Sequence, residues 1–298
     1  ITKVAIVDTD CHHGDGTQDI YWHDPNTLFI SIHQDGRTLY PGSGFINEFG
    51  GPNAIGTTIN VPLPPQTSED GFLYAIKEVV LPILQDFKPD IIINSAGQDN
   101  HYTDPITNMN FSAQGYAELT ALLKPDIAVL EGGYSIEGAL PYVNLGIVLA
   151  MAGLDYSYVK EPDYDPVKIG QSTDVSDSIR QVGDTILSYW QQRKNIQEQI
   201  QSKGDIFERR REIFYDTDGI VETQTEQVKA CLECGGVWQI DSSSDRGQHL
   251  LAVHIPVSAC ESCQNLGYRW YDKAETQGFD FIFLQDRSTD DYHAQSKT

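Results

Sequence analysis

Residues 4–16 read VAIVDTDCHHGDG, a short apolar run that passes directly into aspartates, histidines and glycines. Residues 4–7 are apolar throughout, which predicts a strand buried on both faces of a sheet. Similar short runs, rich in β-branched residues, recur at residues 28–32, 57–61, 91–93 and 127–130. We therefore expect these five runs to form the strands of one sheet.

Segments with helical spacing lie between the strand-like runs. Residues 72–87 carry apolar side chains three and four positions apart, Ser112 can cap a helix that continues to residue 123, and residues 135–154 form a third, very apolar segment. A Lys-Pro pair ends each of the first two. The alternation of strands and helices predicts an α/β domain with a mostly parallel sheet flanked by helices.

The sequence changes character after about residue 156. Residues 155–165, rich in Tyr, Asp and Pro, predict a surface segment, and residues 176–201 predict an amphipathic helix. The charged run at residues 208–212 that follows predicts a solvated helix face. Shorter alternating stretches with Gly and Asp then indicate a β-rich module. The predicted domains are an α/β domain at residues 1–160, a helical connector at 161–212 and the module at 213–298.

Charge and composition exclude several classes of protein. The 298 residues carry 43 acidic and 20 basic side chains, a net charge of -23, which opposes binding to nucleic acid or anionic membranes and favours cationic ligands. The sequence has no apolar run of about 18 residues and no basic-then-apolar leader, so we expect no membrane span, no secretory signal and a cytoplasmic protein.

Side chains capable of chemistry follow the ends of four predicted strands. Because the carboxyl ends of parallel strands meet at one edge of a sheet, we expect these side chains to lie together. Asp10, His12 and Asp99 supply three oxygen and nitrogen ligands and leave a fourth position open, the pattern of a catalytic zinc site. Either aspartate alone would also fit as a turn or helix cap, but their joint placement with His12 favours the metal.

Four segments resemble, in order and spacing, the histone deacetylase superfamily of zinc amidohydrolases, which shares its fold with arginase. The segments are residues 8–16, 33–44, 97–105 and 131–134. The resemblance covers residues 3–150 and implies hydrolysis of an N-acyl amide, acetyl above all, on a lysine or a polyamine, with a metal-bound water as nucleophile.

The resemblance also implies a role for individual residues. Tyr134 would donate a hydrogen bond to the developing oxyanion. Asp10, His12 and Asp99 would hold the catalytic Zn²⁺. The substrate channel would be lined by Tyr40, Ile106 and Gly133, and a potassium ion would be bound by Asp8, Asp10, His12 and Ser31.

One expected part of such a site is absent from the sequence. The superfamily uses a tandem histidine pair as general base, upstream of the first metal motif, and Asp8 and Asp15 match the carboxylates that orient it. The chain opens with Ile1 and runs straight into a strand. We therefore expect it to be incomplete as a fold and as a catalyst, with the pair supplied by a missing N-terminal segment or a second chain.

Two other functions remain open at this point. The chain would be a non-catalytic subunit if it held metal and bound a partner without doing chemistry. It would be an arginase-like dinuclear manganese hydrolase if a second carboxylate followed Asp99 by two residues, a position that His101 holds here.

Four of the five cysteines form the pattern C-x2-C-x25-C-x2-C: Cys231, Cys234, Cys260 and Cys263. This spacing predicts a zinc ribbon with a closed, structural Zn²⁺ site, whereas two disulfides would require an oxidising compartment. Acidic residues such as Glu233 and Asp241 lie nearby, so we expect a structural role or a protein partner, with direct nucleic-acid binding unlikely. Residues 268–271, which are largely aromatic, predict a packed strand.

Overall fold

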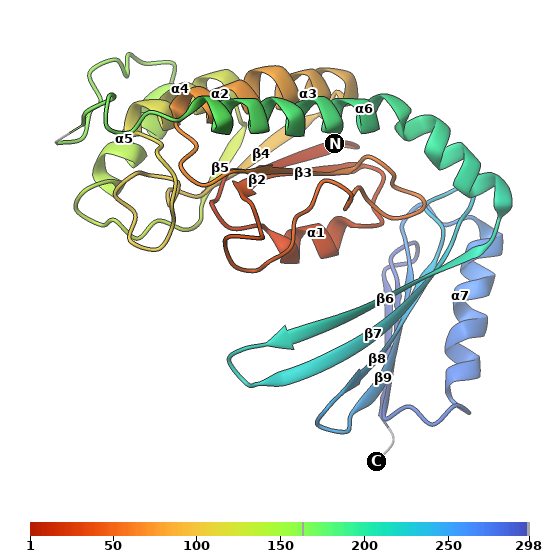
Figure 1. Cartoon of the computed structure of the whole chain (residues 1–298). Helices are drawn as coiled ribbons and strands as arrows, with labels where there is room; N and C mark the ends of the chain where they lie inside the picture. The colour runs from red at the N-terminus through yellow and green to blue at the C-terminus, as the bar shows by residue number, and fades with distance from the viewer. Residues whose placement is uncertain (163, 297–298) are drawn as a thin grey trace. The chain divides into compact units, whose positions relative to one another are not determined.

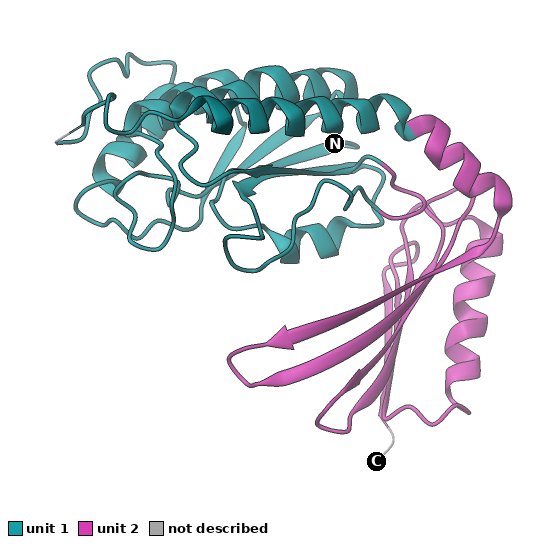
Figure 2. Cartoon of the chain, viewed as in Figure 1, with its two compact units in different colours: residues 1–50, 56–193 teal, residues 51–55, 194–298 magenta. Residues whose placement is uncertain are grey.

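The computed structural model describes residues 1–162 and 164–296. Contacts divide the chain into two compact units, Ile1–Gly50 with Gly56–Arg193, and Gly51–Ile55 with Lys194–Thr298 (Figure 2). The short segment Gly51–Ile55 therefore interrupts the first unit in sequence and belongs to the second. None of the helices in the described ranges combines the length and apolarity that crossing a membrane requires.

Five parallel strands form the sheet of the first unit, in the order β3-β2-β1-β4-β5. They are β1 Val4–Asp8, β2 Thr27–Gln34, β3 Thr58–Leu63, β4 Ile91–Ala96 and β5 Ile127–Leu130. Each coincides with one of the apolar runs, so the prediction of a parallel α/β sheet is confirmed. Val4 pairs with Thr27 on one side and Ile91 on the other, so the residues that follow Asp8 leave the sheet at its centre.

Helices cover both faces of this sheet. In Figure 1, α2, α3, α4 and α6 lie over one face and α1 lies on the other. The helices are α1 Asp15–Tyr21, α2 Glu69–Tyr74, the π-helical turn η1 Ala75–Val80, α3 Leu81–Phe87, α4 Ala113–Leu123, α5 Leu140–Met151 and α6 Thr173–Lys203. Ser112 caps α4 as expected, since its side chain accepts a hydrogen bond from the Gly115 N–H.

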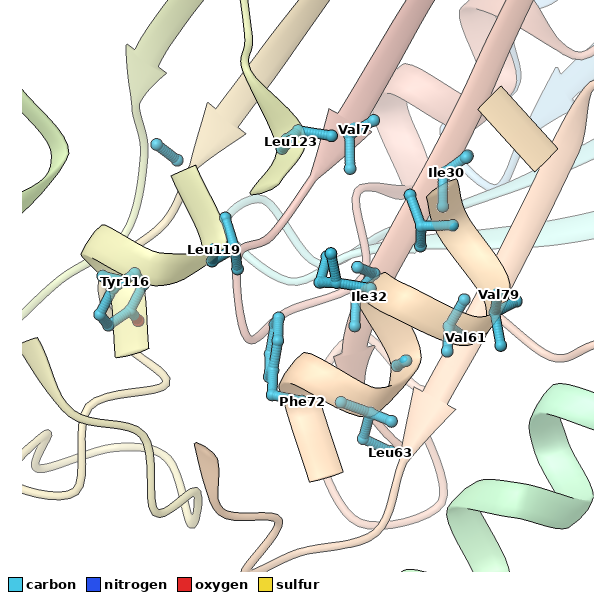
Figure 3. Close-up of a cluster of buried hydrophobic side chains, with 14 of the residues drawn as sticks. Val7, Ile30, Ile32, Val61, Leu63, Phe72, Val79, Tyr116, Leu119 and Leu123 are labelled. Atoms are coloured by element: carbon cyan, nitrogen blue, oxygen red, sulfur yellow. The ribbon is translucent and has the colours of Figure 1, made fainter. Parts of the chain in front are cut away.

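The main core lies between the sheet and its helical layer (Figure 3). Ile30 and Ile32 of β2 and Phe72 of α2 are completely buried there. Burial of an apolar side chain of this size contributes roughly 1.5–3 kcal/mol to stability. This packing fixes the strands, and therefore the loops at their carboxyl ends.

The second unit contains a six-stranded sheet in the order β11-β10-β9-β8-β7-β6. Its elements are β6 Ile206–Tyr215, β7 Ile220–Lys229, β8 Trp238–Ser244, β9 His249–Ile255, α7 Glu261–Ala274, β10 Phe281–Asp286 and β11 Asp291–Ser296. Helix α7 connects the parallel pair β9 and β10, and the other neighbouring strands are antiparallel. A small core forms around Val253, Tyr271 and Leu284.

Two local predictions were wrong. Residues 268–271 lie in helix α7, because the buried Cys263, Gly267, Tyr271 and Ala274 recur at helical spacing. Residues 208–212 lie in strand β6, where exposure alternates with every residue and Arg209 pairs with Glu226 of β7 at 3.1 Å.

Residues 155–165, which we expected at the surface, are exposed or half-buried over most of their described part, with two exceptions. Val159 and Glu161 are buried. Glu161 Oε1 lies 3.2 Å from the buried His101 Nε2. This hydrogen bond gives the buried carboxylate a partner in place of water.

Candidate functional site

Three loops place polar side chains at the carboxyl edge of the first sheet. Asp10 and His12 lie just after β1, Asp99 lies just after β4, and Tyr134 follows β5. Strand β1 pairs directly with β4, and β4 with β5. The adjacency of these strands in the sheet, and not their distance in sequence, brings the residues together.

Asp10, His12 and Asp99 form a compact group of ligand atoms. His12 Nδ1 lies 2.8 Å from Asp99 Oδ2 and 3.1 Å from Asp10 Oδ1, and one ligand atom from each residue falls within 4.8 Å of the others. Zinc ligands at about 2.0–2.2 Å from the ion stand roughly 3.4 Å apart in a tetrahedron. The ligand atoms would therefore have to move apart by only a few tenths of an ångström to hold a divalent ion, and the donor set suits Zn²⁺.

Backbone contacts hold the two carboxylates in place. The Gly132 N–H donates to Asp10 Oδ2, and the Cys11 N–H donates to Asp99 Oδ1, both at 2.8 Å. A Cβ atom at Gly132 would lie 2.6 Å from Asp99 Oδ2, so only glycine allows this approach. The loop after β5 is thus tied directly to the ligand group.

The two carboxylates raise the pKa of His12 to about 10, through its hydrogen bonds to Asp10 and then Asp99. The imidazole is consequently a cation at neutral pH when no metal is bound. A divalent ion can replace this positive charge between the carboxylates, provided the proton leaves. The group is therefore built to hold a cation.

We expect Zn²⁺ binding at this group to release about one proton at neutral pH, because His12 must become neutral to act as a ligand. The affinity should rise by up to tenfold per pH unit as the pH increases toward about 10, the pKa of His12. Titration calorimetry in buffers of different ionisation enthalpy measures the released proton. The same titration of the Asp99→Asn protein measures the contribution of the cysteines, which is subtracted. An affinity of the Asp10, His12 and Asp99 group that is constant between about pH 6 and 8 would contradict the expectation.

Tyr134 lies next to this group and keeps its phenol protonated. Its side chain is 49% exposed, and partial burial, with the charges of Asp99 and Asp10, raises its pKa. The Tyr134 N–H donates to Asp104 Oδ2 at 2.9 Å, and the preceding Gly133 has φ +154°. The phenol is thus a hydrogen-bond donor carried on a loop whose backbone is fixed.

The other predicted site residues occupy loops and strand ends at the same edge. Tyr40, 70% exposed, and Ile106, 51% exposed, lie at the surface, and the Ile106 N–H donates to Asp104 Oδ1 at 3.0 Å. Asp15 is exposed at the start of α1. Their assignment to a substrate channel or to catalysis stays a prediction.

Asp8 is the last residue of β1 and pairs with Ser31 inside β2. Burial raises the pKa of Asp8 to about 8, although its Oδ1 accepts a hydrogen bond from the Asp10 N–H at 3.0 Å. Ser31 Oγ lies 2.9 Å from His33 Nδ1, and His33 Nε2 lies 3.0 Å from the Gly44 carbonyl oxygen. His33 is therefore a structural histidine, and complete burial lowers its pKa to about 3.

Sequence reasoning missed two contributors to the site. Asp104 joins the loops after β4 and β5, since it accepts from the N–H groups of both Ile106 and Tyr134. Glu161 fixes His101 from 60 residues away. Asp104 lies inside the segment 97–105, which carries part of the resemblance, so it could have been considered. No sequence signal connects Glu161 to His101.

The four clustered cysteines of the second unit form a second metal-binding group. All are free thiols, with sulfur atoms within 4.8 Å of one another. The sulfurs of Cys231 and Cys260 are 3.9 Å apart, close to the roughly 3.8 Å that Zn–S bonds of about 2.3 Å impose in a tetrahedron. A hydrogen bond with Ser262 lowers the pKa of Cys260 to about 6, whereas burial raises the pKa of Cys234 and of Cys263. Of these three thiols, Cys260 therefore favours the thiolate that a metal requires most strongly.

Comparison with known proteins identifies similarities over the first half of the chain. Residues 1–145 match the model of the histone deacetylase domain. A protein of Archaeoglobus fulgidus named "Probable deacetylase" is 51% identical over 170 residues, which cover 54% of this chain and 47% of that protein. The acetoin utilization protein AcuC of Bacillus subtilis is 36% identical over 171 residues, 54% of this chain and 44% of its own.

Solved structures support the same similarity. The HDA15 HD domain aligns with a TM-score of 0.56 and 28% identity, covering 67% of this chain and 55% of that one. The histone deacetylase Clr3 aligns with a TM-score of 0.57 at 24% identity, covering 75% of this chain and 41% of that one, and shows the shared fold. The chain spans about half the length of the two curated relatives, 47% and 44%.

Proposed function

We propose that this chain is a member of the histone deacetylase superfamily, whose domain model residues 1–145 match, and that it carries the metal-binding part of a zinc-dependent amidohydrolase. The reaction is hydrolysis of an N-acyl amide, acetyl above all, to a carboxylate and a free amine. The observation that supports it most is the convergence of Asp10, His12 and Asp99 from two strands on one point. This donor set leaves a position open for substrate, as catalytic zinc sites do.

Each part of the group has a distinct task in this proposal. Asp10, His12 and Asp99 would hold Zn²⁺, which when bound polarises the acyl carbonyl and activates a water molecule. Tyr134 donates its phenolic hydrogen to the carbonyl oxygen as negative charge develops there. Its raised pKa keeps that hydrogen in place, and Asp104 fixes the backbone that carries it.

The substrate class follows from charge and from the exposed edge of the site. The net charge of -23 favours a substrate with cationic neighbours, such as acetylated lysine in a protein or an acetylated polyamine. Tyr40, Ile106 and Gly133 would line the channel for its alkyl stem. These residues lie on the loops that follow β2, β4 and β5.

A proton acceptor is the one task that His12, His13, His33 and His101 do not fill. His13, His33 and His101 each have both ring nitrogens in hydrogen bonds, and His12 is a ligand. We propose that a histidine pair on a complementary segment, in the same polypeptide or another, acts as the base, oriented by Asp8 and Asp15. A Cβ atom at Gly14 would lie 2.2 Å from Asp8 Oδ2. The Asp8 carboxylate therefore lies against Gly14, the residue that precedes Asp15.

The edge strand β5 would receive that complementary segment. Ile127, Val129 and Leu130 are 45%, 46% and 62% exposed, although β5 belongs to a parallel sheet, and such sheets are normally covered on both faces. Within the described residues β5 pairs with β4 alone. An added strand would satisfy its free backbone groups and shield these apolar side chains.

A potassium ion beside Asp8 and a structural Zn²⁺ at the four cysteines complete the proposal. Asp8 is buried with a pKa of about 8, so a cation at the Asp8, Asp10, His12 and Ser31 group would restore its ionised form. The cysteine module would stabilise the second unit and present a docking surface for a protein partner.

The test is turnover of a fluorogenic acetyl-lysine peptide, and of an acetylated polyamine, by the zinc-loaded chain. We expect turnover only when a complementing segment with adjacent histidines is present, since a general base contributes about 10²–10⁴-fold. The Asp99→Asn chain with the same segment is the matched control. If the zinc-loaded chain is inactive in every combination, the alternative of a non-catalytic assembly subunit replaces the hydrolase.

A further inference from the structure

Asn53 is buried inside the second unit, although it lies 178 residues before Cys231 in the sequence. Its exposed fraction is 1%. It belongs to the segment Gly51–Ile55, which interrupts the first unit and is the only part of the second unit drawn from the N-terminal half. A buried amide needs partners for its donors and acceptor, and those partners lie around the first cysteine pair.

The side chain of Asn53 joins three backbone groups of the loop that carries Cys231 and Cys234. Its Oδ1 accepts from the Cys231 N–H at 3.0 Å. Its Nδ2 donates to the carbonyl oxygens of Lys229 at 2.9 Å and Gly235 at 3.0 Å. One N–H donor and two carbonyl acceptors fix the orientation of the amide, and only asparagine offers this combination from so short a side chain.

The surrounding backbone is shaped to this contact. A Cβ atom at Gly236, where φ is +80°, would lie 2.3 Å from Asn53 Nδ2, so glycine is required there. The adjacent Gly236 N–H donates to Cys234 Sγ at 3.3 Å. The backbone of Asn53 is held by helix α6, because Gln197 Nε2 donates to the backbone carbonyl oxygen of Asn53 at 3.1 Å.

We infer that Asn53 is a positioning residue of the cysteine metal site, holding the Cys231–Cys234 loop ready for a thiophilic divalent ion. The inference rests on the proposed metal site at the four cysteines. Linkage is reciprocal, so an ion that binds more tightly because Asn53 is in place must also stabilise the segment Gly51–Ile55. The ion of the second unit thereby orders a stretch of the N-terminal half of the chain.

The first test measures metal affinity on the full chain. Co²⁺ is the probe, because thiolate ligation gives it charge-transfer absorption that the Asp10, His12 and Asp99 group does not produce. We expect Asn53→Ala to weaken binding about 10–100-fold, the usual effect of removing a partner that orients ligands. Asn53→Asp should be at least as weak, since a carboxylate oxygen would face the two carbonyls, and the exposed Asn47→Ala is the matched control.

The second test does not depend on a variant at Asn53. Hydrogen exchange of a peptide covering residues 49–56 is compared between the zinc-loaded protein and its Cys231→Ser variant, and we expect faster exchange in the variant. An Asn53→Ala affinity within twofold of the unaltered protein, or unchanged exchange on loss of the ion, overturns the inference. If Cys231→Ser keeps the charge-transfer band, the proposed cysteine site itself fails, which is a separate outcome.

Discussion

The Asp99→Asn protein is expected to hold one zinc ion per chain where the unaltered chain holds about two. Asp99 is fully buried, and its Oδ2 lies 2.8 Å from His12 Nδ1. The substitution preserves the shape of the side chain but removes one of the two carboxylate charges. The neutral amide of asparagine cannot balance the positive charge of a divalent ion. Metal affinity at this group should fall by more than about 100-fold. Loss of a direct ligand should exceed the roughly 10–100-fold loss that follows removal of a group hydrogen-bonded to a ligand.

Elemental analysis after dialysis gives the count, with Asp19→Asn as the control because Asp19 is an exposed aspartate of the neighbouring helix α1. Retention of both ions by Asp99→Asn would refute the ligand assignment. Two manganese ions and no zinc in the unaltered chain would instead revive the dinuclear alternative. The structure gives that alternative little support, since His101, at the position where the second carboxylate would stand, is bonded to Glu161 and Thr103.

Cys231→Ser should remove the other ion and unfold much of the second unit. The small core of that unit includes Cys263 and packs against the remaining three cysteines of the cluster. Structural Zn²⁺ contributes roughly 10–16 kcal/mol of apparent binding energy at neutral pH, which is folding energy when no site exists in the unfolded chain. A module with so small a core cannot replace that contribution.

The measurements are zinc content and near-ultraviolet circular dichroism, which reports on Trp238 and Trp270 of the second unit. Cys11→Ala is the control, because Cys11 is a buried thiol outside the cluster, in the core of the first unit. That variant should keep the cysteine-bound ion. A Cys231→Ser protein that keeps both ions and its tertiary signal would exclude the zinc ribbon.

Local patterns were sufficient wherever burial imposes a period on the sequence. Strands β1 to β4 are apolar runs because a parallel sheet is largely buried, and β5 has the same apolar pattern although its side chains are exposed. The spacing of the four cysteines predicts the cluster that the structure shows. The wrong predictions arise where a local pattern has two interpretations. Residues 208–212 read ERRRE, a charged run that suits a solvated helix as well as the strand that cross-strand pairing with β7 selects.

The sequence by itself determined the parallel α/β class, because strand and helix patterns alternate along it, and it supplied the candidate metal ligands, because these stand in short motifs. Only the tertiary structure decided that Glu161 pairs with His101, that Asp104 connects the loops carrying Ile106 and Tyr134, and that Asn53 belongs to the cysteine unit. These contacts join residues separated by up to 178 positions. A buried polar group gains its partner from whatever the packed chain places beside it, and no periodicity in the sequence records that neighbour.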